Sequence, residues 1–214
     1  MANDHSHDGD HHPHPRARDH MVKHWEHREA AIRGLLIEKG VLSADEIRKK
    51  IEEWEQKTPA LGARIVARSW VDPKFEGRLL ADGNAAASEL GIDAHGPKIV
   101  ALKNTNRRHH LVVCTLCSCY PRALLGLQPT WYKAPAYRSR AVNDPRGVLA
   151  EFGTHLPANV EVRVVDSTAD CRYLVLPMRP SGTESWDEER LAGLVTRDSM
   201  IGVAPARSAD TEPP

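Results

Sequence analysis

The sequence predicts an α+β protein, with an N-terminal helical arm followed by a mixed α/β sandwich domain that carries a cysteine-rich loop. Three observations predict this fold class. Apolar residues recur at helical spacing between about residues 21 and 92. Apolar runs of strand length follow from about residue 97, and one of them alternates with charged residues. Three of the four Cys lie within six residues, just after one of these runs.

Residues 1–20 are expected to form a disordered tail. They hold six of the twelve His and almost no apolar side chain, so the segment cannot offset the entropy cost of becoming ordered. A solvated tail is the simpler interpretation. The alternative is weak capture of a transition metal by neighbouring imidazoles, and both interpretations stay open.

Residues 21–95 are expected to form a helical arm that packs on a partner or on the rest of the chain. Gly40 is expected to end a first helix, whose apolar face contains Val22, Trp25, Ile32, Leu35 and Leu36. Ser43 followed by Glu46 has the spacing of a capping box and predicts the start of a second helix. A third, Ala- and Leu-rich region runs from Lys74 to Leu90. Because large apolar residues are few, the arm is not expected to form a core by itself.

Residues 96–205 are expected to form the domain that carries the loop. Its predicted strands are Lys98–Lys103, Leu111–Cys114, Val160–Val164 and Tyr173–Leu176. Helices are predicted between residues 129 and 152, with breaks at Pro135 and Pro145, because proline interrupts a helix.

One more helix and a tail are expected at the C-terminal end. Ser185 and Glu188 predict the start of that helix, which would carry Leu191, Leu194 and Val195. Residues 206–214 are expected to form a loose C-terminal tail.

The charge balance and hydropathy of the chain argue against several partners. Lys plus Arg and Asp plus Glu number 29 each, so no net charge favours nucleic acid or an anionic membrane. No apolar run approaches the roughly 20 residues that span a bilayer, and the His-rich start lacks the apolar core of a secretory signal. A cytoplasmic, reducing location is therefore expected, where four Cys favour metal or redox chemistry over disulfides.

The cysteine-rich loop has the pattern C-x-x-C-x-C, formed by Cys114, Cys117 and Cys119. Three thiols this close can bind one soft metal ion. A structural zinc site normally needs a fourth protein ligand, which Cys171 or His109 could supply, although neither belongs to a paired motif. An iron–sulfur cluster would need a fourth Cys at a family spacing. The spacing favours a metal site, while a redox loop and buried inert thiols stay open as alternatives.

The loop and several other segments resemble the nitrile hydratase alpha subunits. The string Cys-Thr-Leu-Cys-Ser-Cys-Tyr, residues 114–120, resembles their metal-binding signature, and Thr115 with Tyr120 is the form seen in cobalt-type members. The resemblance runs from about residue 21 to 203. Further segments that carry it are Ala63–Ala67, Ser69–Pro73, Trp131–Lys133, Tyr137–Arg140, Asp144–Arg146, Arg172–Pro177, Gly182–Glu184 and Thr196–Gly202.

This resemblance implies an enzyme, a hydro-lyase that hydrates nitriles to amides at a low-spin Co(III) centre. The thiolates of Cys114, Cys117 and Cys119 and the backbone amides of Ser118 and Cys119 are implied to bind one cobalt per chain, with iron less expected. Cys117 is implied to be a sulfinate and Cys119 a sulfenate, and Cys119 and Ser118 are the implied catalytic residues. The open position of the ion would act as a Lewis acid.

The resemblance also implies partners. A beta subunit supplies two arginines that hydrogen-bond the oxidised sulfurs, so the active site would be incomplete in this chain alone. A heterodimer or heterotetramer is therefore expected, with a small nitrile as substrate. A metallochaperone or activator is a further expected partner, whereas no nucleic acid or membrane is expected.

Arg122 departs from the family pattern, because many nitrile hydratases carry an aromatic residue there. Arg122 and Trp131 are expected in the substrate pocket. One interpretation of Arg122 is a solvent-facing or ion-paired residue, and the other is a cation that suits an anionic substrate. Thiocyanate hydrolase gamma subunits resemble the chain over the same span, so such a subunit is the alternative function. A cobalt or zinc binding module without turnover is a third hypothesis.

Overall fold

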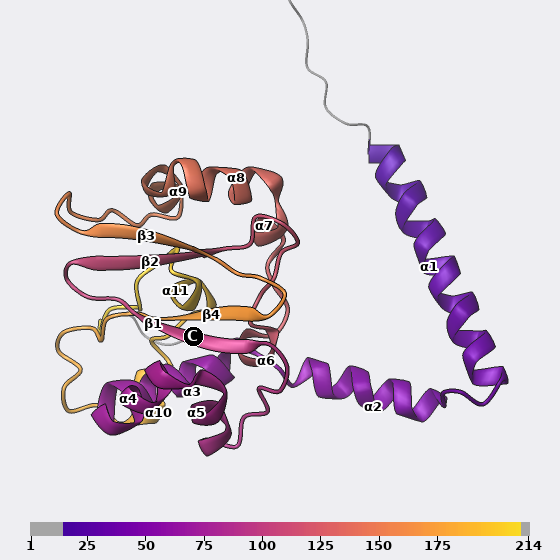
Figure 1. Ribbon diagram of the computed structural model, residues 1–214, viewed down its shortest axis with the longest axis horizontal. Helices are drawn as coiled ribbons and strands as arrows, with labels where there is room; N and C mark the ends of the chain where they lie inside the picture. The colour runs from indigo at the N-terminus through magenta and orange to yellow at the C-terminus, as the bar shows by residue number, and fades with distance from the viewer. Residues whose placement is uncertain (1–14, 211–214) are drawn as a thin grey trace, which may run out of the picture. The chain divides into compact units, whose positions relative to one another are not determined.

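The structure is a computed structural model that describes residues 15–210, with side chains described from residue 24 onward (Figure 1). The chain divides into two compact units, with the boundary between Glu52 and Glu53. The expected His-rich tail falls mostly on residues 1–14, which lie outside the described residues, as do residues 211–214 of the expected C-terminal tail. Residues 15–20 instead begin a helix, since proline is favoured at its first position and good helix formers follow.

The first unit contains α1 (Pro15–Glu38) and most of α2 (Ala44–Glu55). Gly40 follows α1 with a φ of 66°, a left-handed conformation that glycine adopts without strain. The backbone N–H of Ser43 donates to Oε2 of Glu46 at 2.7 Å, and the N–H of Glu46 donates to Oγ of Ser43 at 3.1 Å. The end of the first helix and the capping box of the second, both predicted from the sequence, are thus confirmed.

Four strands form two small parallel sheets in the second unit, which confirms the α+β fold class. β1 (Lys98–Lys103) pairs with β4 (Cys171–Leu176), and β2 (Arg108–Val113) pairs with β3 (Glu161–Asp166). All four lie where the apolar runs predicted strands. The register places Val113 opposite Asp166, so the chain leaves β2 for the cysteine-rich loop beside the end of β3.

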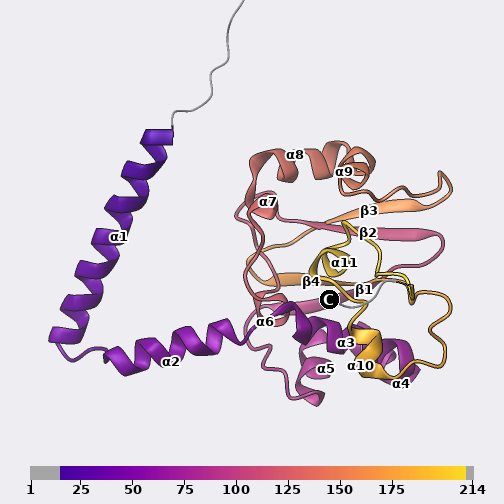
Figure 2. The same cartoon turned by 180° about the vertical axis from the view of Figure 1, so that it is seen from behind.

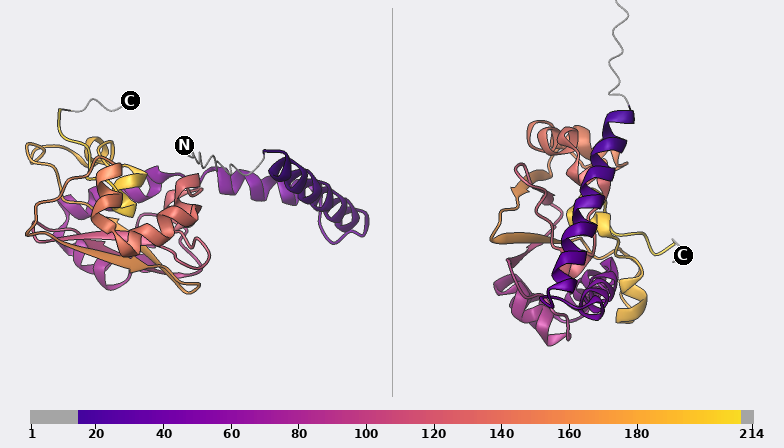
Figure 3. Two further views of the ribbon diagram at one scale, coloured as in Figure 1. Left: turned by 90° about the horizontal axis from the view of Figure 1, so that it is seen from above. Right: turned by 90° about the vertical axis from the view of Figure 1, so that its right-hand side faces the viewer.

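Helices lie on both sides of these strands (Figures 1 and 2). α3 (Pro59–Val71) packs on α4 (Pro73–Ala81), and α4 and α5 (Gly83–Glu89) contact β1. On the other side, α8 (Pro135–Asn143) contacts β2 and α9 (Pro145–Glu151) contacts β3. The right-hand view of Figure 3 also shows the strands between the two groups of helices.

The expected arm of residues 21–95 does not coincide with the first unit, because α3, α4 and α5 belong to the second. Their inward faces supply fully buried core residues, among them Ile65, Val66 and Leu79. No separate helix was predicted at α3, although its residues lie in the region of helical spacing between about residues 21 and 92. Its buried face consists largely of Gly and Ala besides Ile65 and Val66, so it lacks the stripe of large side chains that marks an amphipathic helix.

The region from residue 129 to 152 folds as its prolines predicted, whereas the short helix α6 (Arg122–Leu125) before it was not predicted. After α6, the short helix α7 (Thr130–Lys133) precedes α8 and α9, which begin at Pro135 and Pro145. Proline is tolerated at the first helical position, where its missing N–H would have no partner in the helix.

The prediction for the last helix was wrong in where the helix begins and ends. α10 (Glu188–Ala192) is capped by Asp187 rather than Ser185, and Gly193 ends it before Leu194. A second helix that was not predicted, α11 (Arg197–Ile201), follows, with Thr196 and Ser199 forming its capping box. The apolar residues assigned to one helix thus lie in and between two short helices.

Among the helices of residues 15–210, none combines the length and the apolar composition that a membrane span needs.

Candidate metal centre

The loop after β2 gathers three sulfur atoms in one place. The Sγ atoms of Cys114 and Cys117 lie 3.7 Å apart and those of Cys117 and Cys119 lie 3.0 Å apart, with all three within 4.8 Å of one another. Cys114 and Cys119 are buried, whereas Cys117 is exposed. Together the three thiols can hold one ion, which would be accessible from the side of Cys117.

Ser118 gives the loop its shape. Its φ of 67° makes it the one non-glycine residue with a positive φ in the part of the chain that the structure describes. A left-handed conformation costs a non-glycine residue about 1–2 kcal/mol, and such strain is found at functional sites. The sharp turn at Ser118 accompanies the close approach of the sulfurs on either side of it, and it bends the backbone between them around the site.

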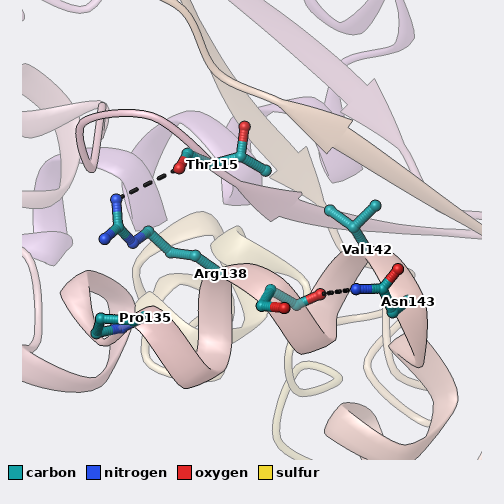
Figure 4. A pocket seen from close by; sticks show the side chains of 6 residues that line it. Thr115, Pro135, Arg138, Val142 and Asn143 are labelled. Carbon is teal, nitrogen blue, oxygen red and sulfur yellow. Dashed lines mark hydrogen bonds between the residues drawn. The ribbon is translucent and has the colours of Figure 1, made fainter.

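Side chains from β3, α7 and α8 hold the loop in place. Asp166 accepts two hydrogen bonds from Thr115, from its backbone N–H at 3.0 Å and from its hydroxyl at 2.5 Å. Nη1 of Arg138 donates to the carbonyl oxygen of Leu116 at 3.1 Å. It also donates to the carbonyl oxygen of Thr115 at 3.4 Å, the bond drawn in Figure 4. The hydroxyl of Tyr132 donates to the carbonyl oxygen of Cys119 at 2.8 Å. The loop is therefore held by hydrogen bonds from three different elements of the fold.

Sequence reasoning missed these anchoring residues. Tyr132 and Arg138 lie within segments that carry the family resemblance, but no anchoring role was predicted for them or for Asp166. The available signal was the position of Asp166 two residues after the predicted strand Val160–Val164. The parallel pairing of β3 with β2, which brings this carboxylate beside the start of the loop, is seen only in the structure.

The surroundings of Cys114 and Cys119 shift the pKa values of the two thiols in opposite directions. Burial opposes ionisation of Cys114, but the backbone N–H groups of Cys117 and Cys119, the thiol of Cys117 and the N–H of Leu116 together lower its pKa. One of these bonds, from the N–H of Cys117, is 3.3 Å long. Burial, followed by the hydrogen bond with Cys117, raises the pKa of Cys119 to about 12. The loop therefore favours ionisation of Cys114, whereas the proton of Cys119 would be displaced by a bound metal ion.

The donor set fits a soft transition metal. Thiolates select ions such as cobalt, iron, copper or zinc over magnesium and calcium. The three Cys are the one group of His, Cys, Asp or Glu within the described residues whose ligand atoms converge enough to bind an ion. The fourth ligands considered for a zinc site do not join them. Cys171 lies on β4, and buried His109 donates from Nε2 to the carbonyl of Gly202 at 2.7 Å and accepts from Asn104 at 3.2 Å.

The two residues expected in the substrate pocket lie in different surroundings. Trp131 is half-buried in an aromatic cluster, with ring centroids 4.9 Å from Tyr137 and 4.8 Å from Phe152. Its sequence neighbour Tyr132 connects this cluster to the loop. Arg122 is exposed, and its Nε donates to Oε1 of Gln128 at 2.7 Å. A role in substrate binding stays a prediction for both.

The fold and the site define a metal-binding protein whose ion is held by a cysteine loop at the carboxyl end of a parallel strand. The family model described as nitrile hydratase, alpha chain, matches residues 23–204. The chain therefore belongs to the nitrile hydratase alpha-chain family, which confirms the resemblance drawn from its motifs.

Several characterised relatives are similar over most of their length. The chain is 55% identical to the low-molecular weight cobalt-containing nitrile hydratase subunit alpha of Rhodococcus rhodochrous, over 83% of this chain and 86% of that protein. It is 50% identical to the cobalt-containing nitrile hydratase subunit alpha of Pseudonocardia thermophila, over 85% and 90%. The thiocyanate hydrolase subunit gamma of Thiobacillus thioparus is 43% identical, over 86% and 80%.

Solved structures show the same fold. A recombinant thiocyanate hydrolase with partially modified cobalt centres superposes with a TM-score of 0.82 at 42% identity, covering 86% of this chain and 91% of that one. An Fe-type nitrile hydratase mutant from Comamonas testosteroni Ni1 also has a TM-score of 0.82, at 39% identity, covering 89% and 95%. Cobalt and iron proteins are thus both among the structures that this chain is similar to.

Proposed function

We propose that this chain is the metal-bearing alpha subunit of a cobalt-type nitrile hydratase, hydrating nitriles to amides together with a beta subunit. The observation that carries the proposal is the convergence of three sulfurs within 4.8 Å on the loop that follows β2. The family match over residues 23–204 supports the reaction class. The cobalt-containing relatives at 55% and 50% identity support the choice of ion.

The ligands we propose are the sulfurs of Cys114, Cys117 and Cys119 and the backbone nitrogens of Ser118 and Cys119. When bound, the metal supplies Lewis acidity for the addition of water to a nitrile carbon. The chain contributes the geometry: Tyr132 holds the carbonyl of Cys119, and the left-handed turn at Ser118 lies between the two later sulfurs. We place Ser118 and Cys119 at the catalytic centre for this reason.

Oxidation of two of the thiols is part of the proposal. A sulfinate at Cys117 and a sulfenate at Cys119 are successive products of thiol oxidation. The exposure of Cys117 supports its higher oxidation state, because an oxidant reaches it from solvent, whereas Cys114 is fully buried. The charged oxygen atoms would then need hydrogen-bond donors, which we expect from two arginines of the beta subunit.

A partner surface is also supported by the first unit. Large apolar side chains stay exposed there, with relative exposures of 62% for Trp25, 59% for Ile32 and 50% for Leu35. A groove of about 700 Å³ is lined by Trp25, Ile32, Leu36, Leu42 and Ile47. Apolar surface of this kind marks an interaction site. We therefore propose that α1 and α2 pack on the beta subunit in a heterodimer or heterotetramer, with an activator or metallochaperone serving metal loading.

The experiment that tests this function is a kinetic assay of the co-expressed complex. The value of kcat/KM for hydration of a small nitrile should be measured by amide formation, with thiocyanate as the competing substrate. Efficient hydration and poor turnover of thiocyanate are expected. Absence of amide from a fully metal-loaded complex would contradict the proposal and leave a binding module without turnover.

One observation favours a second candidate, a thiocyanate hydrolase gamma-like subunit. Arg122 provides a permanent positive charge three residues after the last cysteine of the loop, and such a charge would favour an anionic substrate. The 43% identity to a thiocyanate hydrolase subunit gamma is consistent with it. The exposure of Arg122 and its bond to Gln128 weigh against a direct role. A preference of the complex for thiocyanate in the same assay would replace the first candidate with this one.

A further inference from the structure

A path of two hydrogen bonds joins Arg138 of α8 to the sulfur of Cys114. Nη1 of Arg138 donates to the carbonyl oxygen of Leu116 at 3.1 Å, and the N–H of Cys117 donates to Sγ of Cys114 at 3.3 Å. The carbonyl of Leu116 and the N–H of Cys117 belong to the same peptide group. The guanidinium and the sulfur therefore act on opposite ends of one peptide dipole.

This arrangement transmits the charge of Arg138 to the sulfur. A guanidinium stays protonated in proteins, so its positive charge is permanent. Its bond to the carbonyl polarises the peptide and makes the N–H on the other side a stronger donor, because hydrogen bonds in series strengthen one another. A stronger N–H bond withdraws electron density from the thiolate. Cys114 then becomes a weaker electron donor to any metal that it binds.

The fold holds both ends of this path. Asp166 fixes Thr115 through two hydrogen bonds at the start of the loop. On the side of α8, the hydroxyl of Tyr137, the residue before Arg138, donates to the carbonyl of Val112 at 2.7 Å. Figure 4 shows Arg138 extended from α8 toward Thr115. Its position over the loop is therefore imposed by strand β2, strand β3 and helix α8 together.

Arg138 differs in its surroundings from Arg140, a neighbour on the same helix. The side chain is half-buried, and its Nε is a buried atom that has no hydrogen-bond partner within the described chain. Arg140, two residues later on the same helix, is exposed and pairs instead with Glu151 at 2.6 Å. The two arginines thus share a helix but differ in what they contact.

We propose that Arg138 is a positioning residue that weakens the electron donation of Cys114 through the Leu116–Cys117 peptide, which makes the bound metal a stronger Lewis acid. This inference rests on the proposed function, in which Cys114 is a metal ligand. The backbone nitrogen of Cys117 is not among the proposed ligands. It keeps its proton in the loaded protein, and the path stays intact.

The test compares Arg138→Met and Arg138→Lys with Arg140→Met in the cobalt-loaded complex with the beta subunit. Three quantities are measured: the wavelength of the sulfur-to-cobalt charge-transfer absorption, kcat and KM for a small nitrile, and the melting temperature. Arg140→Met removes an arginine from the same helix without touching the loop. Arg138→Lys keeps the charge but replaces the planar group with a single ammonium.

Arg138→Met should move the absorption to longer wavelength, because the sulfur regains electron density. It should lower kcat by about tenfold, in the range typical of residues that support a metal ligand, with KM near the wild-type value. Arg138→Lys should fall between wild type and Arg138→Met, and Arg140→Met should match wild type. If Arg138→Met does not assemble, Arg138→Gln takes its place with the same expectations.

Two results would overturn the inference. One is an unshifted absorption in Arg138→Met, even with a lower melting temperature, because a purely structural role predicts that outcome. The other is an equal shift in Arg140→Met. A wild-type complex without the absorption or without nitrile turnover would instead contradict the proposed function. The two failures are therefore distinguishable.

Discussion

The three cysteines of the loop differ from Cys171 in their surroundings, and this difference predicts how each tolerates substitution. The loop sulfurs converge within 4.8 Å, while Cys171 lies apart from them on β4 as a half-buried free thiol. Serine at a loop position would offer a hard hydroxyl oxygen in place of a soft sulfur. At Cys171, by contrast, only a small packing group would change.

Cys114→Ser, Cys117→Ser and Cys119→Ser should each abolish nitrile hydration, whereas Cys171→Ala should retain it. The assay is amide formation by the complex, with metal content measured on the same samples. Mass spectrometry of the peptide that contains residues 114–119 should also show added oxygen. Full activity in any of the three loop variants would remove that sulfur from the proposed ligand set, and an unoxidised peptide from active enzyme would remove the sulfenate.

Substitution of Arg122 distinguishes between the two candidate functions, nitrile hydratase and thiocyanate hydrolase. Because the side chain is exposed, its attraction for an anion is limited to about 1 kcal/mol, roughly a fivefold preference. Arg122→Trp should therefore lower kcat/KM for thiocyanate by up to about fivefold and leave or improve that for an aromatic nitrile. A wild-type preference for thiocyanate that disappears in Arg122→Trp would favour the thiocyanate hydrolase alternative.

At the scale of elements, strand β2 connects the core to the metal loop and contains two buried histidines. Burial, followed by the charges of Arg108, His109 and Arg163, lowers the pKa of His110 to about 4, and burial also lowers the pKa of His109. Both are therefore neutral in the folded protein near pH 7. Unfolding allows them to bind protons at their ordinary pKa of about 6.5.

Stability should consequently fall as the pH decreases from about 6.5 toward 4, since the unfolded chain binds more protons in that window. For His110 the full effect is about 3 kcal/mol, reached near pH 4. Urea unfolding of wild type and His110→Gln at pH 7 and pH 5 measures it. The variant should lose less stability between the two values, and equal losses would show that His110 does not contribute.

The elements that the sequence predicted well are those with a strong local signal. The four strands follow apolar runs, and α8 and α9 begin at prolines. α3 was missed because Gly and Ala form much of its buried face, and α11 because only the spacing of Thr196 and Ser199 marks it. Which strands pair depends on contacts far apart in sequence. β2 with β3 could not be read from either strand alone.

The same distinction holds for the site. The spacing of the three cysteines predicted the convergence of their sulfurs. The anchors Asp166, Arg138 and Tyr132 lie between 13 and 51 residues from the loop atoms they bind, so only the folded chain brings them there. The left-handed conformation of Ser118 was not predicted either, because serine has no local preference for a positive φ.

On the scale of the whole molecule, the chain exposes apolar and metal-binding groups that a partner would cover. The first unit exposes large apolar side chains, and the loop leaves Cys117 open. The isolated chain should therefore show little nitrile hydration, and addition of the beta subunit during expression should restore it. The measurement is amide formation per metal ion with and without the partner. Robust turnover by this chain alone would contradict the proposed role of the partner. The cytoplasmic location stays a prediction.

The most direct test of the central claim is metal analysis of the active complex. Expression in cobalt-supplied medium, followed by elemental analysis and the nitrile assay on one preparation, compares metal content with turnover. We expect about one cobalt per alpha chain, with activity proportional to cobalt content, because three converging thiolates favour a soft transition metal. Stoichiometric zinc or iron without cobalt in a fully active preparation would contradict the choice of ion. Stoichiometric zinc without activity in this cobalt-supplied preparation would contradict it as well.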